Sequence, residues 1–355
     1  MKTNSKLLMG LFVAIIITSG CVENTDDGES TTSPVAVNDF SITPNPAPGD
    51  QTVSVQMELE NTGDQDIEGV YARLFGPTFA SGSNQERTWR TSEGGQVSQA
   101  YRTMDIGDLN APSDTSPAVP GRDSLTFRSP SIEDGRIVPY TFNTRIQYRT
   151  RTTGSTDITV MSNERYQETQ SSQTSPEVDT SDGPIQLEIQ GTTPHVFYDV
   201  GTADEEMCVT VRNEGSGTPF LATTNNGATT SGAGYDISDQ AEGKVELRLE
   251  DVGNVQFSSQ ETGENEVVVE LIGAEGYHCF DMELIGLGQI TDLEQTTEIP
   301  IEVVYGYEQE TSTSVTVEGR RDSSTNSDTA DGDSDTQESE QNNDEEEGIG
   351  SPGLQ

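Results

Sequence analysis

Histidine and cysteine are the residue types that could hold a transition metal here, and both are scarce. The chain has two histidines, His195 and His278, and three cysteines, Cys21, Cys208 and Cys279. A trigonal copper site needs two histidines and one cysteine on one face, with a distant axial methionine. His278 directly precedes Cys279, and adjacent residues of a strand point to opposite faces. We therefore expect no copper or zinc site and no cofactor.

Other motifs that carry chemistry are also missing. The sequence has no Gly-x-Ser-x-Gly elbow, no His-Glu-x-x-His pair and no glycine-rich loop with a lysine that could cradle phosphate. The stretch 331–335 opens like a calcium loop, but Thr336 and Asn342 stand where an EF-hand needs glycine and glutamate. Carboxylates are so frequent that none is singled out as catalytic. We expect a protein that is not an enzyme, with a surface hydrolase as an alternative.

Cys21 carries the clearest chemical signal. Residues 1–20 combine a short basic start, an apolar run and small residues at the end, which is typical of a secretory signal. The apolar run is shorter than the roughly 20 residues of a membrane span. Ser19 and Gly20 before Cys21 resemble the lipobox of bacterial and archaeal lipoproteins, although Thr18 stands where that family prefers leucine. The resemblance implies cleavage before Cys21 and lipidation of its thiol, hence an exported protein on the outer face of the cytoplasmic membrane. An ordinary signal peptide is the alternative.

The charge of the chain is extreme. It has 62 acidic and 18 basic residues, a formal net charge of −44, and Lys244 is the only lysine after the signal. High Asp and Glu with very little Lys resembles the proteins of extreme halophiles, in which molar salt screens the self-repulsion. The alternative is an acidic protein with a disordered tail, but residues 322–355 hold only 11 of the acidic residues. Nucleic acid, itself a polyanion, is not expected as a partner.

Alternation of apolar and polar residues, clearest over Thr52–Glu60, predicts an all-β chain. We interpret residues 142–160 as a hairpin that turns at Thr153-Gly154-Ser155, and Leu221–Asp239 as a long exposed loop. The expected organisation is a flexible lipidated spacer over 21–33, a β-sandwich over 34–167, a linker over 168–183, a second β-sandwich over 184–321 and a disordered acidic tail over 322–355.

The two folded segments look like copies of one unit. Met57–Gly63 corresponds to Val209–Gly215 at a shift of 152 residues, and Ile146–Val160 corresponds to Val303–Val317 at a shift of 157. Two matches in the same order at nearly the same spacing favour duplication over chance similarity between strands.

Repeated all-β units with a strand followed by Asn-x-Gly resemble the immunoglobulin-like domains of prokaryotic surface proteins, above all the cell-adhesion-related domain of bacteria and archaea. The resemblance implies two tandem immunoglobulin-like β-sandwiches. With Cys21 lipidated, Cys208 and Cys279 remain, and an exported protein most simply pairs them in a disulfide. Tyr277 before Cys279 resembles the tyrosine corner of that fold, although no tryptophan lies between the two cysteines. Two free buried thiols are the alternative.

Arginine is distributed unevenly between the copies. Eleven of the fifteen arginines lie in residues 34–167, against 17 acidic residues, while residues 184–321 have 26 acidic and five basic residues. Arg145, Arg149 and Arg151 share strand parity and should line one face. Such a row could bind a sulfated or carboxylated envelope polysaccharide or the carboxylates of a surface protein. The alternative is a solvated face that offsets neighbouring carboxylates.

These patterns favour a lipid-anchored protein of a halophile's cell envelope that acts as a non-catalytic binding, adhesion or scaffold module. Its expected partners are the membrane, through the anchor, and envelope polysaccharide or surface proteins. The alternatives are the substrate-binding lipoprotein of a transporter, which would need many helices, and a surface hydrolase.

Overall fold

The computed structural model describes residues 33–80, 88–91, 102–113, 115–198, 205–222, 229–231, 234–286 and 293–319. The expected signal peptide, Cys21, the spacer before Ser33 and the acidic tail lie outside them. Nearly every element within them is a β-strand, which confirms the all-β prediction. The one helix in these stretches, α1 (Asn163–Thr169), begins after Ser162, whose hydroxyl accepts a hydrogen bond from the backbone of Arg165. No helix in the described part of the chain is long and apolar enough to cross a membrane.

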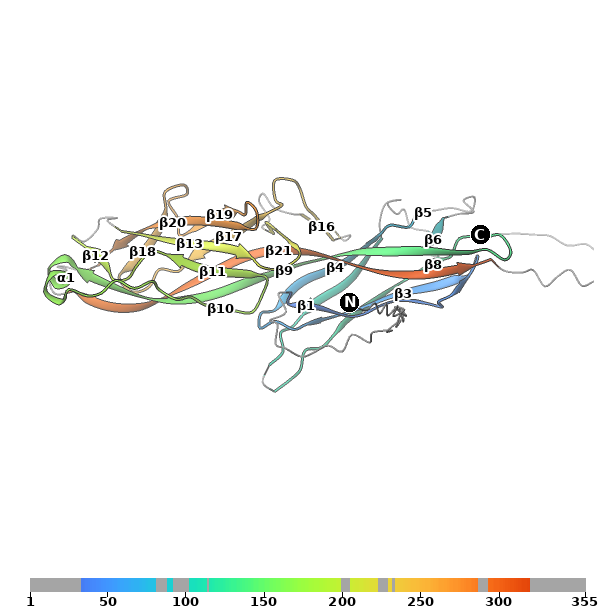
Figure 1. The fold of residues 1–355 in the computed structure, drawn as a ribbon, viewed down its shortest axis with the longest axis horizontal. Helices are drawn as coiled ribbons and strands as arrows, with labels where there is room; N and C mark the ends of the chain where they lie inside the picture. Colours follow the sequence, from blue (N-terminus) through green and yellow to red (C-terminus); the bar gives the residue numbers. More distant parts are fainter. Residues whose placement is uncertain are drawn as a thin grey trace, which may run out of the picture.

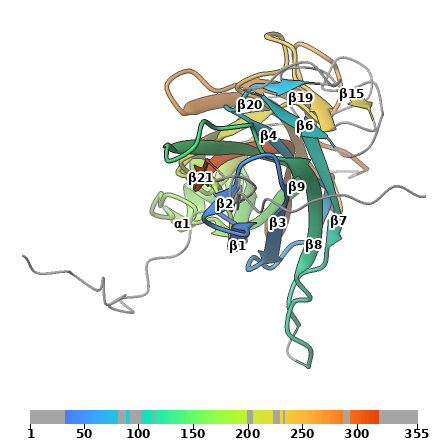
Figure 2. The same cartoon turned by 90° about the vertical axis from the view of Figure 1, so that its right-hand side faces the viewer.

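Two β-sandwiches lie end to end in one elongated body (Figure 1), and Figure 2 views this body with the first sandwich toward the reader. One sheet of the first sandwich has the order β1-β3-β8-β6-β5. One sheet of the second has the order β11-β13-β20-β18. The strands of these two sheets are β1 (Val35–Thr43), β3 (Thr52–Asn61), β8 (Gly121–Arg128), β6 (Trp89–Thr91), β5 (Phe79–Ala80), β11 (Ile185–Gln190), β13 (Glu205–Asn213), β20 (Glu275–Leu284) and β18 (Val255–Ser259).

The third sheet is shared by both sandwiches and has ten strands. Its main path is β19-β17-β21-β9-β4-β7, and the short strands β2, β10, β12 and β14 pair with β9 or β21 beside that path. Strands β15 and β16 form a separate small hairpin. The bounds are β19 (Glu266–Glu270), β17 (Lys244–Leu249), β21 (Glu294–Glu318), β9 (Ile137–Ser162), β4 (Ile67–Phe75), β7 (Arg102–Leu109), β2 (Ala47–Pro48), β10 (Asp179–Thr180), β12 (His195–Phe197), β14 (Thr218–Phe220), β15 (Thr229–Ser231) and β16 (Gly234–Asp236).

Strands β9 and β21 run side by side through both sandwiches (Figure 1). They pair antiparallel without a break, from Ile137 opposite Glu318 to Met161 opposite Glu294. The hairpin expected at Thr153-Gly154-Ser155 is therefore wrong, because the strand continues straight through those residues.

Gly154 is explained by a close approach rather than by a turn. A Cβ atom at this position would lie 3.0 Å from the side chain of Leu187 and 3.1 Å from that of Val178. Both side chains pack over β9, so a glycine that reads as a turn signal in the sequence leaves room for its neighbours.

Each sandwich is completed by a strand from the other half of the sequence. The first part of β9 pairs with β4, and its last part pairs in parallel with β12, where Val160 lies opposite His195. The first part of β21 pairs with β17, and its last part pairs in parallel with β2, where Val317 lies opposite Ala47. The expected units 34–167 and 184–321 thus do not use only their own residues. The two units exchange their last strands. Strands β9 and β21 each continue straight from one sandwich into the other instead of turning back as a hairpin.

With this exchange, each sandwich has immunoglobulin-like strand order. An immunoglobulin sandwich places strands A, B, E and D in one sheet and G, F and C in the other. The first sandwich matches with β1, β3, β8 and β6 in one sheet and with the end of β21, the start of β9 and β4 in the other. Its G strand therefore comes from the second copy. The second sandwich receives the end of β9 in the same way.

The internal repeat predicted from the sequence is visible in the hydrogen bonds. The side chain of Asn61 accepts from the backbone of Gly63 at 3.0 Å and donates to the carbonyl of Gln65 at 2.8 Å. The side chain of Asn213 accepts from Gly215 at 3.2 Å and donates to Gly217 at 2.9 Å. The same turn thus closes the same strand in both copies.

The exchanged ends of β9 and β21 are anchored by buried apolar side chains. Ile158 and Val160 of β9 are at most 1% exposed, and so are their counterparts Val315 and Val317 of β21. Burial of such a side chain stabilises by about 1.5–3 kcal/mol. The exchanged strands are therefore part of the cores that they complete.

Candidate functional site

The outer face of the shared sheet, at the middle of the β9–β21 ladder, brings the predicted arginines together. Arg149 lies directly opposite Gly306 there. The shift of 157 residues between the copies takes Arg149 to Gly306, so the two residues are counterparts in the repeat. A pseudo-two-fold axis therefore passes through the ladder at this pair.

Arg145, Arg149 and Arg151 lie on the same outward face, and 43–51% of each side chain is exposed. Each faces a carboxylate on a neighbouring strand. A guanidinium nitrogen of Arg149 lies 3.6 Å from Glu68 of β4, and one of Arg151 lies 3.2 Å from Glu302 of β21. The geometry fits the interpretation of a solvated face that offsets carboxylates, and about half of each arginine side chain remains exposed to a partner.

Arg145 has the most partners of the three. Its Nε atom lies 2.8 Å from Glu310 and 3.6 Å from Glu308, both on β21, and its guanidinium lies 5.0 Å from the centre of the Phe75 ring. The hydrogen bond to Glu310 raises the pKa of Arg145, against the opposing effect of burial. This side chain is held in place by charge and by an aromatic face together.

A covering segment of the second copy, which includes Phe220 and Tyr235, lies over part of the outer face beside the arginines. Gln147 shares their parity but is buried, and it accepts from the backbone of Tyr235 and donates to Glu308. The Phe220 ring packs directly against Gly306, where a Cβ atom would clash with it. Burial raises the pKa of the Tyr235 hydroxyl to about 12. The prediction of an exposed loop over Leu221–Asp239 is wrong for Leu221 and Tyr235, which are both buried.

Two hollows flank the axis on this face. One, of about 280 Å³, contains Arg145, Gln147, Thr218, Phe220 and Glu308 and is completed by the covering segment. The other has a volume of about 240 Å³. It contains the repeat counterparts of these five residues, which are, in the same order, Glu302, Val304, Asp66, Glu68 and Arg151. The two hollows therefore have counterpart walls of different chemistry, and among the described residues the covering segment contributes to the first hollow alone.

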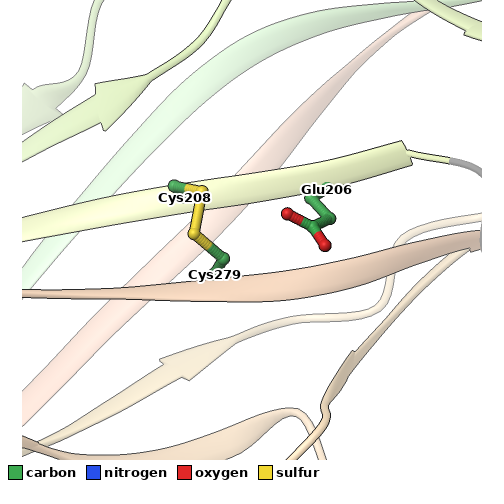
Figure 3. Close-up of side chains that lie close together, drawn as sticks. All are labelled: Glu206, Cys208 and Cys279. Carbon is green, nitrogen blue, oxygen red and sulfur yellow. A yellow bond between two sulfur atoms is a disulfide. The ribbon is translucent and has the colours of Figure 1, made fainter.

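Cys208 and Cys279 form a disulfide, which confirms the expected pairing (Figure 3). They lie directly opposite each other on β13 and β20, two adjacent strands of one sheet. This differs from the immunoglobulin hallmark, in which the disulfide joins the two sheets. Tyr277 is 67% exposed, so it does not form the buried tyrosine corner that the sequence suggested.

Glu206 lies close to the two sulfur atoms (Figure 3), with the ligand atoms of all three residues within 4.8 Å of one another. A thiolate is the form of cysteine that binds metals, and both sulfurs here are engaged in the disulfide. The cluster in this oxidised form therefore offers only a carboxylate.

The two histidines lie in separate surroundings. His195 of β12 is buried, and its Nδ1 lies 3.3 Å from a carboxylate oxygen of Glu205. The Nε2 atom of His278 lies 2.9 Å from the hydroxyl of Ser259. Because His278 and Cys279 are adjacent on β20, the His278 side chain lies on the face opposite to the disulfide. Neither histidine is placed with a cysteine ligand, so the structure brings together no set of the copper type among these residues.

The glutamates that face the arginines were missed in the sequence, although a signal was present. The repeat alignment with its shift of 157 places Arg145 on Glu302 and Arg151 on Glu308. A reversal of charge at equivalent positions of two copies would have indicated that the two rows face each other. The straight path of β9, which was not foreseen, is what brings them into contact.

Comparisons with known proteins identify no family for this chain. No family model and no curated protein matches the chain. Among solved structures, the chain aligns with the collagen adhesin of S. aureus at 9% identity and a TM-score of 0.10, over 82% of this chain and 94% of that one. A score this low supports no argument about fold or function.

Proposed function

We propose that this protein is a lipid-anchored envelope protein of a halophile that acts as a rigid, non-catalytic scaffold or binding module on the outer face of the cytoplasmic membrane. The β9–β21 ladder is the observation that carries the proposal. A strand of 25 residues, at about 3.4 Å per residue, extends on the order of 80 Å. Because this ladder belongs to both sandwiches, no flexible hinge separates them.

A rigid body of this length suits a protein that holds something at a distance from a membrane. Two tandem domains joined by a flexible linker would change their relative orientation, since such motion is the default between domains. Here a bend between the sandwiches would break main-chain hydrogen bonds in the middle of a sheet. The alternative of a transporter's substrate-binding lipoprotein loses support, because it would need helices and the described residues hold only α1.

The anchor is tested by the substitution Cys21→Ser in the native host. We expect the variant to move from the membrane fraction to the medium, or to remain uncleaved, because stable attachment needs the lipid. A cleaved Cys21→Ser protein that stays in the membrane fraction would contradict the proposal. Cys208→Ala/Cys279→Ala is the matched control, since it also replaces cysteines but should leave attachment unchanged.

The binding role is tested with the released Cys21→Ser protein as bait on cell envelopes in molar salt. The exposed halves of Arg145, Arg149 and Arg151 are the proposed contact, through bidentate hydrogen bonds that lysine reproduces poorly. We expect the triple change to lysine to weaken capture nearly as much as the triple change to alanine. Normal capture by the alanine variant would remove this face as the contact.

A further inference from the structure

The arginine excess of the first copy matches a glutamate row on the second. Arg145 is paired with Glu310 at 2.8 Å and with Glu308 at 3.6 Å. Arg151 is paired with Glu302 at 3.2 Å. In both cases the arginine belongs to the first copy and the carboxylates belong to β21, so these ion pairs join the two halves of the sequence.

A further pair of the same kind lies at the end of the ladder. The Nε atom of Arg165, on α1 just after β9, lies 2.8 Å from Glu294 at the start of β21. Three arginines of the first copy therefore face glutamates along most of the length of β21.

The symmetry of the repeat relates these ion pairs to one another and indicates which copies can pair. The pseudo-two-fold axis takes Arg145 to Glu302 and Glu308 to Arg151, so one ion pair is the image of the other with its charges reversed. Two identical copies related by such an axis would carry the same charge at both positions. The divergence of the copies has made each complementary to the other and not to itself.

Pairing of like copies in this register brings like charges together. Two β9 strands would place Arg145 of one beside Arg151 of the other. Two β21 strands would place Glu302 of one beside Glu308 of the other. Juxtaposed like charges reject a wrong partner, as the charges flanking coiled-coil seams do.

We propose that the arginines of β9 and the glutamates of β21 are a recognition code that directs each repeat unit to the other unit and away from a second copy of itself. The exchanged strands make this code necessary, because a unit that donates its last strand could complete any similar sandwich. At molar salt the code acts only between groups in or near contact, since the Debye length is then about 3 Å and longer-range attraction is screened.

The test uses the full chain with Cys21→Ser and a protease site inserted between Ser172 and Gln173, two exposed residues of the connection. The chain is cut after it has folded. Both cysteines of the disulfide lie in the second fragment, so nothing covalent joins the fragments. Native mass spectrometry and sedimentation on dilution in molar salt then report which fragments associate, and how tightly.

The nicked protein should remain a one-to-one complex of different fragments. Glu302→Arg/Glu308→Arg should raise the dissociation constant at least about tenfold, because it removes two ion pairs and adds repulsion. Addition of Arg145→Glu, Arg151→Glu and Glu310→Arg, which restores opposite charges in reversed order at all three ion pairs, should bring the constant back to within about threefold of the starting value. Arg122→Glu/Arg136→Glu breaks ion pairs within the first copy only and should change nothing.

Three results would overturn the proposal. The first is an unchanged dissociation constant in the Glu302→Arg/Glu308→Arg variant. The second is failure of the fivefold reversed variant to fold and to associate, since every ion pair of Arg145 and Arg151 with β21 is kept in that variant with its signs exchanged. The third is a pair of identical fragments in the spectrum of the unmodified nicked protein.

Discussion

Arg149 and Gly306 face each other across the β9–β21 ladder and are the same position of the repeat in its two copies. The long, charged side chain lies over the first copy, where it pairs with Glu68. The glycine makes room for the Phe220 ring, which belongs to the segment that covers the second copy's side of the axis. The same position of the repeat thus makes a polar contact in the first copy and an apolar contact in the second.

Gly306→Ala should therefore destabilise the protein. The added methyl group would meet the Phe220 ring, and overpacking of this kind typically costs about 1–3 kcal/mol. Gly183→Ala is the matched control, because a Cβ atom there would find its nearest neighbours at an ordinary 3.5 and 3.6 Å. Chemical denaturation of both variants in molar salt measures the difference, and equal stabilities would show that Phe220 is free to move.

Tyr305→Phe should reveal a buried hydrogen bond and its dependence on pH. The Tyr305 hydroxyl lies 3.0 Å from Oγ1 of Thr152, so its loss should cost about 0.5–1.5 kcal/mol at pH 7. Burial raises the pKa of Tyr305 above its ordinary value near 10. The neutral hydroxyl is thus favoured in the folded state, and its contribution is complete below pH 10 and declines as the pH rises above it.

The stability gap between the native protein and Tyr305→Phe should accordingly narrow above pH 10. Denaturant titrations at pH 7, 9, 10 and 11 provide the measurement. A gap that is constant over this range would mean that the Tyr305 hydroxyl ionises as readily in the folded chain as in the unfolded one.

Removal of the disulfide by Cys208→Ala/Cys279→Ala should lower the free energy of unfolding by about 4 kcal/mol in the chain-entropy model, given a sequence separation of 71 residues. Reduction of the native protein should give a loss of similar size, which separates the cross-link from the effect of the alanines. The fold itself should survive, because β13 and β20 remain paired along their length. A loss below about 1 kcal/mol would mean that these paired strands already restrict the unfolded chain.

Dilution from molar salt to about 0.1 M should unfold the protein, because a net charge of −44 is then poorly screened. The sequence alone suggested that the second unit, which has 26 acidic and five basic residues, would melt first. The exchanged strands change that expectation to a single transition for both sandwiches. Circular dichroism during dilution checks it, and full stability at low salt would refute the proposed origin in a halophile.

Much of the fold could be predicted from the sequence because a strand is identified by the pattern of a few neighbouring residues. The alternation around Val53, Val55 and Met57 identifies a half-buried strand, and the Asn61 turn with its copy at Asn213 identifies the repeat. The expectation of export and the scarcity of other cysteines were enough to predict the pairing of Cys208 with Cys279.

The exchange of strands could not be predicted in this way. Residues Thr153-Gly154-Ser155 have the composition of a turn, and a closed hairpin and an exchanged strand form nearly the same contacts. The choice between them depends on which strand the end of β9 pairs with. That strand, β21, lies about 150 positions away in the sequence. The pairing of the arginines with β21 was missed because it depends on this exchange, although the reversal of charge between the copies was a signal for it.

The exchange of last strands between the two sandwiches can be tested by one truncation of the chain. A chain that ends at Gly306 keeps residues 34–167 intact but lacks the part of β21 that completes the first sandwich. Trp89, the only tryptophan, is buried there, with its ring centre 4.9 Å from that of Phe142. We predict that its fluorescence shifts to the red, as in water, while a chain that ends at Gly319 keeps the emission of the full protein. Unchanged Trp89 emission in the chain that ends at Gly306 would mean that the first sandwich is complete without the second copy and that the last strands are not exchanged.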